Sequence, residues 1–488
     1  MKDISSTGSF INFYLNNYIY VDKTKYIRDL IKLERVFISR PRRFGKSLTL
    51  DTIATLFETG VEPYFKGTWI YDKWTEPTYP VLRLNFLDLD KYSLEHFKQK
   101  LNAIISSFAR DINVKNYEEK VEPEDTIYFL LDELRKEKRQ IVILIDEYDC
   151  QMTANINNET LYKQFQEKIK SFYATIKNKW AIKFLLITGV TKTKNSSVFS
   201  GTDINDITNY SPYSQMIGFT RDEIKKYYID YLKLASSYEN NCSVDNVTDE
   251  QIESMLDMMA QNYDGYCFDE FYKKKVFSTW SVNSFFQSII ENKFVDFGDY
   301  WYDNGGLPSI LVNYLKTHKL NSLDYVEKDK TITIRVNDFK NPTSLTSINQ
   351  NVLMCQTGYL TLRSPVYSKG FMTLGIPNSE VYNALLSLMA LNIFDDTKLE
   401  NVNEQILSQS KDVGEIIELF NTVLNTVSYD NYPISSEAVV QQLLYMYLKG
   451  ICNSVSAELH SSKGRADLVI ESDNRRIVFE FKYAKNEI

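Results

Sequence analysis

Histidine and cysteine are scarce in this 488-residue chain, which has three histidines and five cysteines. The histidines are His96, His318 and His460, and the cysteines stand at positions 150, 242, 267, 355 and 452. No two cysteines form a Cys-x-x-Cys pair, so the usual spacing of a structural zinc site is missing. The odd, dispersed set of cysteines predicts free thiols in a reducing compartment.

Long apolar runs and a surplus of positive charge are missing as well. No window holds about 18 uninterrupted apolar residues, the length that a membrane-spanning helix needs. The N-terminal sequence also lacks the basic start and apolar core of a signal peptide. We therefore expect a soluble, cytoplasmic protein with no membrane partner. The net charge of −8 gives no overall basic field for DNA or RNA, so any such contact must come from local patches.

The composition is that of a globular protein, with 43% hydrophobic and 25% charged residues. In the first 215 or so residues, patterns typical of strands alternate with patterns typical of helices. The expected strands lie at 36–39, 80–86, 140–145 and 182–188, and the expected helices at 48–60, 93–112, 122–138 and 159–177. This alternation predicts an α/β layer with a parallel sheet.

The rest of the chain changes character several times. Residues 218–345 are expected to be mostly helical, 350–380 to have strand character, and 381–425 to be helical again. At the end, the pattern predicts a helix at 434–449 and strands at 454–459, 466–471 and 476–481.

A glycine-poor match to the phosphate-binding P-loop lies at 40–47, with the sequence RPRRFGKS. Its ending fits the pattern G-x-x-x-x-G-K-[ST], but Arg40 stands at the first glycine position. Gly45 lets the backbone approach a phosphate. Lys46 suits the β- and γ-phosphates of ATP, and Ser47 suits Mg²⁺. Arg40, Arg42 and Arg43 add positive charge. The alternative is a basic surface loop before a helix.

A second feature is the segment ILIDEYD, in which acidic residues stand at the carboxyl end of an expected strand. The carboxyl ends of the strands are where α/β sheets place ligands. We expect Asp146 to hold Mg²⁺ through water and Glu147 to polarise the water that attacks ATP. Asp149 is expected to be a local hydrogen-bonding residue. The alternative is a strand that exits into acidic residues facing solvent.

The next strand ends in Thr188, which is a candidate sensor of the γ-phosphate. A plain strand-to-loop transition is the alternative there. No arginine finger can be identified, and Lys192 and Lys194 are the nearest cationic candidates.

A third constellation lies near the C-terminus, in GRADLVI and VFEFK. Asp467 begins one expected strand, while Glu480 and Lys482 stand two apart on the next and so share a face. Two carboxylates and an ammonium suit metal-assisted cleavage of a phosphodiester, and Glu437 on the preceding helix could add a carboxylate. Lys463, Arg465, Arg475 and Arg476 form a basic patch for a phosphate backbone. The alternative is a β-hairpin with solvated charges.

The ordered motifs YVDKT, RPRRFGKSLTL, ILIDEYD, ITGV and the C-terminal GRADLVI…VFEFK resemble the predicted AAA-ATPase-like family fused to a PD-(D/E)XK nuclease-superfamily domain. The resemblance also takes in GFTRDEI, NYDGYCF, TGYLTL and IPNSEV, so it covers nearly the whole chain. An arginine-rich RPRRFGKS loop is itself typical of this family. Such families are associated with bacterial mobile-element or defence settings.

The resemblance implies a P-loop ATPase core at 1–217, a helical lid at 218–345, a connecting α/β region at 346–425 and a restriction-endonuclease-like domain at 426–488. The chain stops six residues after Lys482, where such a nuclease domain usually continues, so we expect the terminal fold to be incomplete. ATP and Mg²⁺ are the expected cofactors.

The residue patterns and the resemblance together give the expected site residues. The expected nucleotide-binding residues are Arg42, Arg43, Phe44, Gly45, Lys46, Ser47, Leu48, Asp146 and Thr188. The expected catalytic residues are Glu147, Asp467, Glu480 and Lys482, and the expected metal ligands are Ser47, Asp146, Glu437, Asp467 and Glu480.

Two functions fit these expectations. One is an ATP-dependent nuclease that acts on DNA or RNA. The other is an ATP-driven switch that sets an assembly state, such as a homo-oligomer, with an inactive nuclease-like domain that serves binding. A third hypothesis is a non-catalytic interaction protein in which these motifs are incidental.

Overall fold

The chain divides into two compact units. In the computed structural model the described residues are 1–177, 179–193, 204–303, 309–315, 325, 328–367, 370–393, 413–427, 436–451, 455–461, 464–472 and 475–482. The first unit comprises residues 1–318 and 331–378, and the second comprises 319–330 and 379–488. The finer division into four parts stays a prediction.

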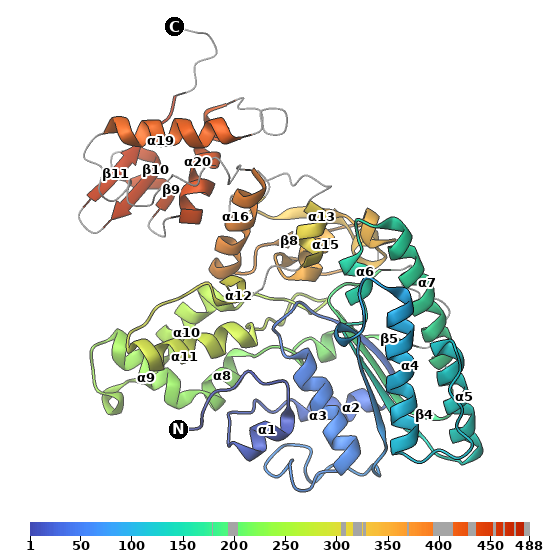
Figure 1. The fold of residues 1–488 in the computed structure, drawn as a ribbon. Coiled ribbons are helices and arrows are strands. Elements are labelled where there is room, and N and C mark those ends of the chain that lie inside the picture. Colours follow the sequence, from blue (N-terminus) through green and yellow to red (C-terminus); the bar gives the residue numbers. More distant parts are fainter. Residues whose placement is uncertain are drawn as a thin grey trace. The chain divides into compact units, whose positions relative to one another are not determined.

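A five-stranded sheet forms the centre of the first unit (Figure 1). Its strands are β1 (Arg35–Ser39), β2 (Val81–Asn85), β3 (Ile141–Asp146), β4 (Ile182–Gly189) and β5 (Asn205–Asp206). They lie in the order β2-β3-β4-β1-β5, and every pairing is parallel. The parallel sheet expected from the alternating pattern is therefore confirmed. Every residue of β3 is buried, as its continuous apolar run predicts.

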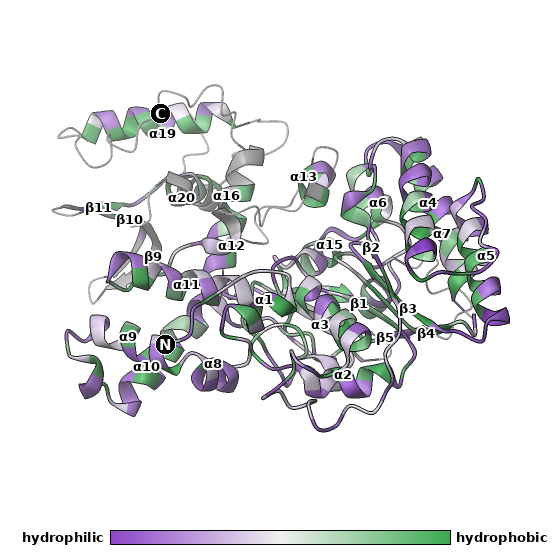
Figure 2. Cartoon of the chain, turned by 60° about the horizontal axis from the view of Figure 1, so that its bottom comes forward, coloured by the Kyte–Doolittle hydropathy of each residue, from purple (hydrophilic) through white to green (hydrophobic). Residues whose placement is uncertain are grey.

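Helices cover both faces of this sheet. Helices α1 and α3 lie on one face, and α4, α5 and α7 lie on the other (Figure 1). The helices of this part are α1 (Phe10–Leu15), α2 (Thr24–Ile31), α3 (Lys46–Thr59), α4 (Leu94–Asp111), α5 (Pro123–Lys136), α6 (Cys150–Ala154) and α7 (Glu159–Ile176). Figure 2 shows largely hydrophobic strands, whereas the covering helices carry hydrophilic residues as well. The layered arrangement buries the sheet on both sides.

The next part of the first unit is mainly helical, as its sequence predicts. Its helices are α8 (Arg221–Tyr227), α9 (Ile229–Glu239), α10 (Asp249–Tyr263), α11 (Thr279–Asn292), α12 (Tyr300–Asp303) and α13 (Ser309–Leu315). Thr220 and Glu223 form a reciprocal capping box at the start of α8, which satisfies two backbone N–H groups there. Tyr228, Phe285 and Phe286 lie in the buried core that joins α8, α9, α10 and α11.

A small antiparallel sheet completes the first unit. It contains β6 (Ile332–Arg335), β7 (Thr361–Leu362) and β8 (Phe371–Gly375), in the order β6-β8-β7. Two helices accompany it, α14 (Val336–Lys340) and α15 (Gln350–Thr357). The strand character expected from residue 350 onward is wrong for residues 350–357, which form α15. Asn349 caps the start of α15 with its side chain, and Gly358 ends the helix with a φ of +96°.

The second unit is a separate α/β arrangement. Its described elements are α16 (Ser379–Ile393), α19 (Val413–Thr426), α20 (Glu437–Ile451), β9 (Val455–Ser461), β10 (Gly464–Ser472) and β11 (Arg475–Phe479). The strands form an antiparallel sheet in the order β11-β10-β9. Strand β11 ends at Phe479, two residues before the strand end expected from the sequence. Within the described ranges of both units, no helix is long and apolar enough to cross a membrane.

Candidate functional site

Three strand ends meet at one edge of the parallel sheet. Strand β4 lies between β1 and β3, so its last residues are flanked by the P-loop on one side and by the acidic strand end on the other. Ile38 of β1 pairs with Thr188, and Ile145 of β3 pairs with Ile187. The strand order therefore brings together Ser47, Asp146 and Thr188, which come from three distant parts of the sequence.

Asp146 is the point at which these elements are joined. Its Oδ2 atom accepts a hydrogen bond of 2.6 Å from the hydroxyl of Ser47. Its Oδ1 atom accepts one from the hydroxyl of Thr188 and one of 3.0 Å from the backbone N–H of Glu147. Thr188 thus contacts the acidic residue directly, which is where a residue that senses the state of the site would lie.

The P-loop backbone has the shape that its glycine and arginines predict. Gly45 has a φ of +96° and stands immediately before α3, and Arg43 also has a positive φ, of +68°. Two such residues turn successive N–H groups toward one concave side, which is how loops bind phosphate. The ring of Phe44 is buried edge-on against Tyr266 and Phe268, with centroid distances of 4.7 and 5.5 Å. These aromatic contacts anchor the loop to residues 266 and 268.

Lys46 is folded back onto its own loop. It is only 5% exposed, and its ammonium group donates to the backbone carbonyls of Arg40 and Pro41 at 3.0 and 3.1 Å. Its Nζ atom also lies 3.8 Å from Oε1 of Glu147. The two residues expected to bind and to hydrolyse ATP are therefore neighbours.

Glu147 sits in an unusual local environment. Its backbone has a φ of +52°, a conformation that a non-glycine residue seldom adopts. Burial raises the pKa of its carboxyl group; Lys46 opposes this rise, while the nearby Asp149 and Asp146 add to it. A carboxylate with a raised pKa accepts a proton more readily, which suits a general base.

Asp149 is more than a local hydrogen-bonding residue. It is 1% exposed, and its carboxylate accepts hydrogen bonds from the backbone N–H groups of Val190 and Thr191 and from the Thr191 hydroxyl. The hydroxyl of Tyr148 donates to the Thr191 carbonyl at 2.9 Å. The segment after β3 is thus tied to the segment after β4, which holds Asp146 and Thr188 in register.

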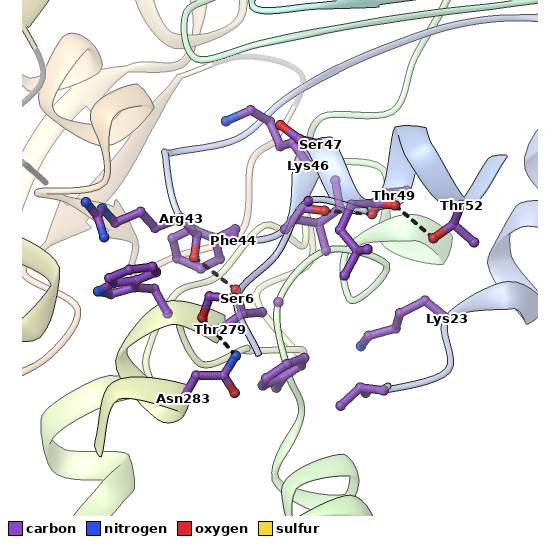
Figure 3. A pocket seen from close by; sticks show the side chains of 18 of the residues that line it. Ser6, Lys23, Arg43, Phe44, Lys46, Ser47, Thr49, Thr52, Thr279 and Asn283 are labelled. Atoms are coloured by element: carbon purple, nitrogen blue, oxygen red, sulfur yellow. Dashed lines mark hydrogen bonds between the residues drawn. The ribbon is translucent and has the colours of Figure 1, made fainter. Parts of the chain in front are cut away.

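A cavity of about 510 Å³ opens beside the P-loop (Figure 3). This volume is in the range of small-molecule sites. The loop and the start of α3 line one side, with Arg42 to Thr49, including Leu48. Other parts of its wall come from residues 5–8, 19–21 and 216–219, from Lys23 and Glu147, and from Thr279, Trp280 and Asn283 of α11. Residues of the part with the parallel sheet and residues of the helical part therefore line this cavity together.

The start of α11 was not anticipated from the sequence as part of this site. The hydroxyl of Thr279 donates to the backbone carbonyl of Arg43 at 3.0 Å, and the guanidinium of Arg43 lies 4.1 Å from the ring centroid of Trp280. Asn283 donates to the hydroxyl of Ser6 at 3.3 Å. These contacts hold the P-loop and the N-terminal segment against the helical part (Figure 3).

Lys23 is a further residue that sequence reasoning missed. It is 8% exposed, lines the cavity, and donates to the carboxylate of Glu223 and to the backbone carbonyl of Gln215. The signal was present in two motifs, YVDKT and GFTRDEI, but nothing in either motif alone shows that they pair. This ion pair links the N-terminal segment to the first helix of the helical part.

The remaining basic candidates have other positions. Lys192 forms an ion pair with Asp206, so its charge is already partnered. Lys194 and Lys463 lie outside the described residues, as do the side chains of Arg465 and Arg475. Arg476 is described and exposed on β11.

In the second unit, Asp467 lies within β10, Glu480 and Lys482 follow the end of β11, and Glu437 begins α20. The hydrogen-bond register pairs Leu468 with Phe479, and the backbone N–H of Phe481 donates to Oδ2 of Asp467 at 2.9 Å. Phe479 and Phe481 both pack near Phe420 of α19. The alternating pattern therefore continues past the strand end, which puts Glu480 and Lys482 on the opposite side.

Glu480 and Lys482 are paired with each other. Their side chains are 69% and 76% exposed, and Nζ of Lys482 lies 3.0 Å from Oε1 of Glu480. The hydrogen bond to Glu480, followed by the charges of Glu437 and Asp467, raises the pKa of Lys482. All four residues thus share one region of the unit.

The two sites differ in how well their side chains suit a metal ion. At the P-loop, the hydroxyl of Ser47 and the carboxylate of Asp146 converge, and such oxygen donors are what Mg²⁺ prefers. At the second site, Asp467 already accepts a backbone N–H and Glu480 is paired with Lys482. Among the described residues of the chain, no three His, Cys, Asp or Glu side chains lie close enough together to hold a metal ion.

Comparison with known proteins finds a family match around each of the two sites. Residues 5–199 match the family model described as predicted AAA-ATPase, and residues 435–488 match the model described as PD-(D/E)XK nuclease superfamily. A curated relative, described as an uncharacterized protein in the vnfD 5′ region of Azotobacter chroococcum mcd 1, is 26% identical over 486 residues. The match covers 96% of this chain and 86% of that relative.

One solved structure, titled as that of Cdc6p from Pyrobaculum aerophilum, aligns over 75% of this chain and 92% of its own. Its sequence identity is 9% and its TM-score is 0.24, so this likeness carries no argument about the fold or the function.

Proposed function

We propose that this chain, which has an AAA-ATPase-like domain at residues 5–199 and a PD-(D/E)XK nuclease-superfamily domain at residues 435–488, binds and hydrolyses ATP at the P-loop edge of its parallel sheet. The observation that carries the proposal is the hydrogen bond from Ser47 to Asp146, which joins the P-loop to the acidic strand end. An unrelated basic loop before a helix would have no reason to meet a buried carboxylate there.

Each residue of the edge has a proposed role. The N–H groups of the loop from Arg42 to Ser47 bind the phosphates, and Lys46 leaves the carbonyls of its own loop to contact the β- and γ-phosphates. Ser47 and Asp146 would hold Mg²⁺, which neutralises charge that develops on the phosphates. Glu147 accepts a proton from the attacking water, and Thr188 reports the state of the γ-phosphate to Asp146. Phe44 and Leu48 shape the cavity wall.

The Asp146→Asn variant tests this proposal. Losing the negative charge weakens the proposed hold on Mg²⁺, which is worth several kcal/mol in transition-state stabilisation, so we expect the rate of ATP hydrolysis to fall by about 100-fold or more. Release of inorganic phosphate measures the rate. Asp72→Asn is the matched control, because Asp72 is exposed and pairs only with Lys73. Equal rates in wild type and Asp146→Asn would remove the carboxylate from the mechanism.

We further propose that ATP turnover controls a metal-dependent nuclease site in the second unit. The family match at residues 435–488 and the grouping of Asp467, Glu480, Lys482 and Glu437 support this. In this proposal Asp467 and Glu480 would supply oxygen ligands to the metal ion, and Lys482 would stabilise charge on the phosphodiester of DNA or RNA. A defence or mobile-element setting is part of the same proposal, as is the cytoplasmic location.

One observation favours a second function for this unit. Glu480 and Lys482 are exposed and form an ion pair with each other. In that case ATP binding switches an assembly state, with a second copy of the chain as partner, and the nuclease-like domain serves binding alone.

A cleavage assay separates the two functions. The nuclease proposal predicts that wild type cuts DNA or RNA with Mg²⁺ and ATP, and that Asp467→Asn and Glu480→Gln each lower the rate by about 100-fold, since a metal ligand is lost. Glu418→Gln, an exposed change on α19, serves as control and keeps full activity. If wild type cuts neither nucleic acid with Mg²⁺ or Mn²⁺, the switch with a binding domain is the better account.

A further inference from the structure

A second cavity, of about 390 Å³, lies on the other side of the P-loop. Ser39 at the end of β1 and Arg40 and Pro41 of the loop line it, and residues 208–210, 267–268, 355–356 and 360–361 contribute other parts of the wall. It shares no lining residue with the first cavity, whose part of the loop begins at Arg42. The loop therefore separates two cavities, and only one of them is explained by ATP.

Arg40, which stands where a P-loop usually has glycine, forms part of this second wall. It is 1% exposed, its Nη1 atom donates to the carbonyls of Ser39 and Thr208, and its guanidinium lies 4.2 Å from the ring centroid of Phe268. Among the described residues, Nε and Nη2 have no hydrogen-bond partner. Burying a polar group without a partner is unfavourable, so two such groups on one side chain need an explanation.

The two unpartnered atoms, Nε and Nη2, lie on the same side of the guanidinium group. The N–H bonds of Nε and Nη2 point in parallel, which is the fork that binds both oxygens of a carboxylate or phosphate. Burial lowers the pKa of Arg40 to about 9, and Asp206 opposes this. The side chain therefore keeps its positive charge at neutral pH. Asp206, whose charge acts on Arg40, is paired with Lys192 and does not accept a hydrogen bond from Nε or Nη2 of Arg40.

The other residues that line the cavity indicate the charge and the polarity of the ligand. Three basic residues line the cavity, Arg40, Lys192 and Lys340, against two acidic ones, Asp206 and Glu270, which leaves one positive charge in excess. Apolar side chains supply much of the remaining surface: Pro41, Phe268, Phe339, Leu360 and Val366. The volume suits a small molecule. One negative charge and an apolar body would complement this wall.

We propose that the cavity binds a small organic oxyanion, a carboxylate or a phosphate ester with an apolar body, held by Nε and Nη2 of Arg40. This is a site separate from that of ATP, and it does not depend on hydrolysis. The backbone carbonyl of Arg40 accepts a hydrogen bond from Lys46, so the two sites meet at this residue.

Benzoate and phenyl phosphate are suitable probes, because each joins an oxyanion to an apolar ring. Their affinities for the full chain are measured by calorimetry and by ligand-observed NMR. We expect wild type to bind at least one of them. The Arg40→Gln variant should weaken binding about tenfold or more, since a charge-assisted bidentate contact is lost. Tighter binding of benzoate assigns a carboxylate ligand, and tighter binding of phenyl phosphate assigns a phosphate ester.

Two further variants fix the location. Arg42→Gln changes the neighbouring arginine, which lines the first cavity, so it should leave the affinity for benzoate and phenyl phosphate unchanged. Val366→Phe fills the second cavity without altering Arg40, so it should abolish binding even if Arg40→Gln does not fold. The proposal is overturned if wild type binds neither probe, if Val366→Phe binds as wild type does, or if Arg42→Gln loses affinity as Arg40→Gln does.

Discussion

ATP hydrolysis by the Glu147→Gln variant is expected to be slower than that of wild type by roughly 10²- to 10⁴-fold, the usual contribution of a positioned general base. Gln keeps the size of the side chain but cannot accept the proton from water. ATP binding should change little, because the loop and Lys46 are untouched. Steady-state phosphate release gives the rate, and calorimetric titration gives the affinity.

The pH dependence of ATP hydrolysis gives a second test of the role of Glu147. Burial raises the pKa of Glu147, so its carboxyl group stays protonated to a higher pH than an ordinary glutamate. The wild-type rate should therefore fall as the pH drops through that raised pKa, above the usual value of about 4.3. The residual rate of Glu147→Gln should lack this decline.

Loss of folding can be separated from loss of catalysis in this variant. Because its pKa is raised, the ionised form of Glu147 is less favourable in the folded chain than in the unfolded chain. This penalty is absent below the unfolded pKa and grows as the pH rises, so Glu147→Gln should not lower the melting temperature at neutral pH. Glu159→Gln, an exposed change on α7, is the matched control. A wild-type rate in Glu147→Gln would exclude Glu147 as the base.

The Lys46→Ala variant should lose both affinity for ATP and hydrolysis. Hydrogen bonds to charged groups contribute about 1.5–3 kcal/mol each, which corresponds to a roughly 10- to 100-fold weaker affinity. Removal of a donor that stabilises charge in the transition state lowers the rate by a further 10²- to 10³-fold. Titration with ATP and phosphate release measure the two effects.

The control for this variant is Lys32→Ala, because Lys32 is exposed and pairs only with Asp29 on the same helix. Thermal melting checks that Lys46→Ala still folds, since Lys46 also contacts the carbonyls of Arg40 and Pro41. Unchanged affinity in a folded Lys46→Ala protein would mean that ATP binds elsewhere.

Local patterns were sufficient to predict four strands of the parallel sheet and the helices α3, α4, α5 and α7, but not β5, α1, α2 or α6. The apolar run at 140–145 could only be a buried strand or a buried helix segment, and its length favoured a strand. The same patterns misjudged 350–357, where capping by Asn349 and Gly358 outweighs the apolar residues. Glu480 and Lys482 were placed on a strand that ends at Phe479.

The contacts that complete the site could not be predicted, because they depend on the order of strands and on distant pairings. The placement of β4 between β1 and β3 is what joins Thr188 to Asp146. The ion pair of Lys23 and Glu223 spans 200 residues of sequence. Arg40 was predicted only to add charge to the loop, and its burial facing a second cavity is a tertiary feature.

The central claim is that the ends of β1, β3 and β4 form one ATP site. Calorimetric titration of the full chain with ATP in the presence of Mg²⁺ tests it most directly. We predict one ATP bound per chain in wild type, and binding that is weakened at least about tenfold in Lys46→Ala. Wild-type protein that binds no ATP, or binds it as tightly after Lys46→Ala, would contradict the claim.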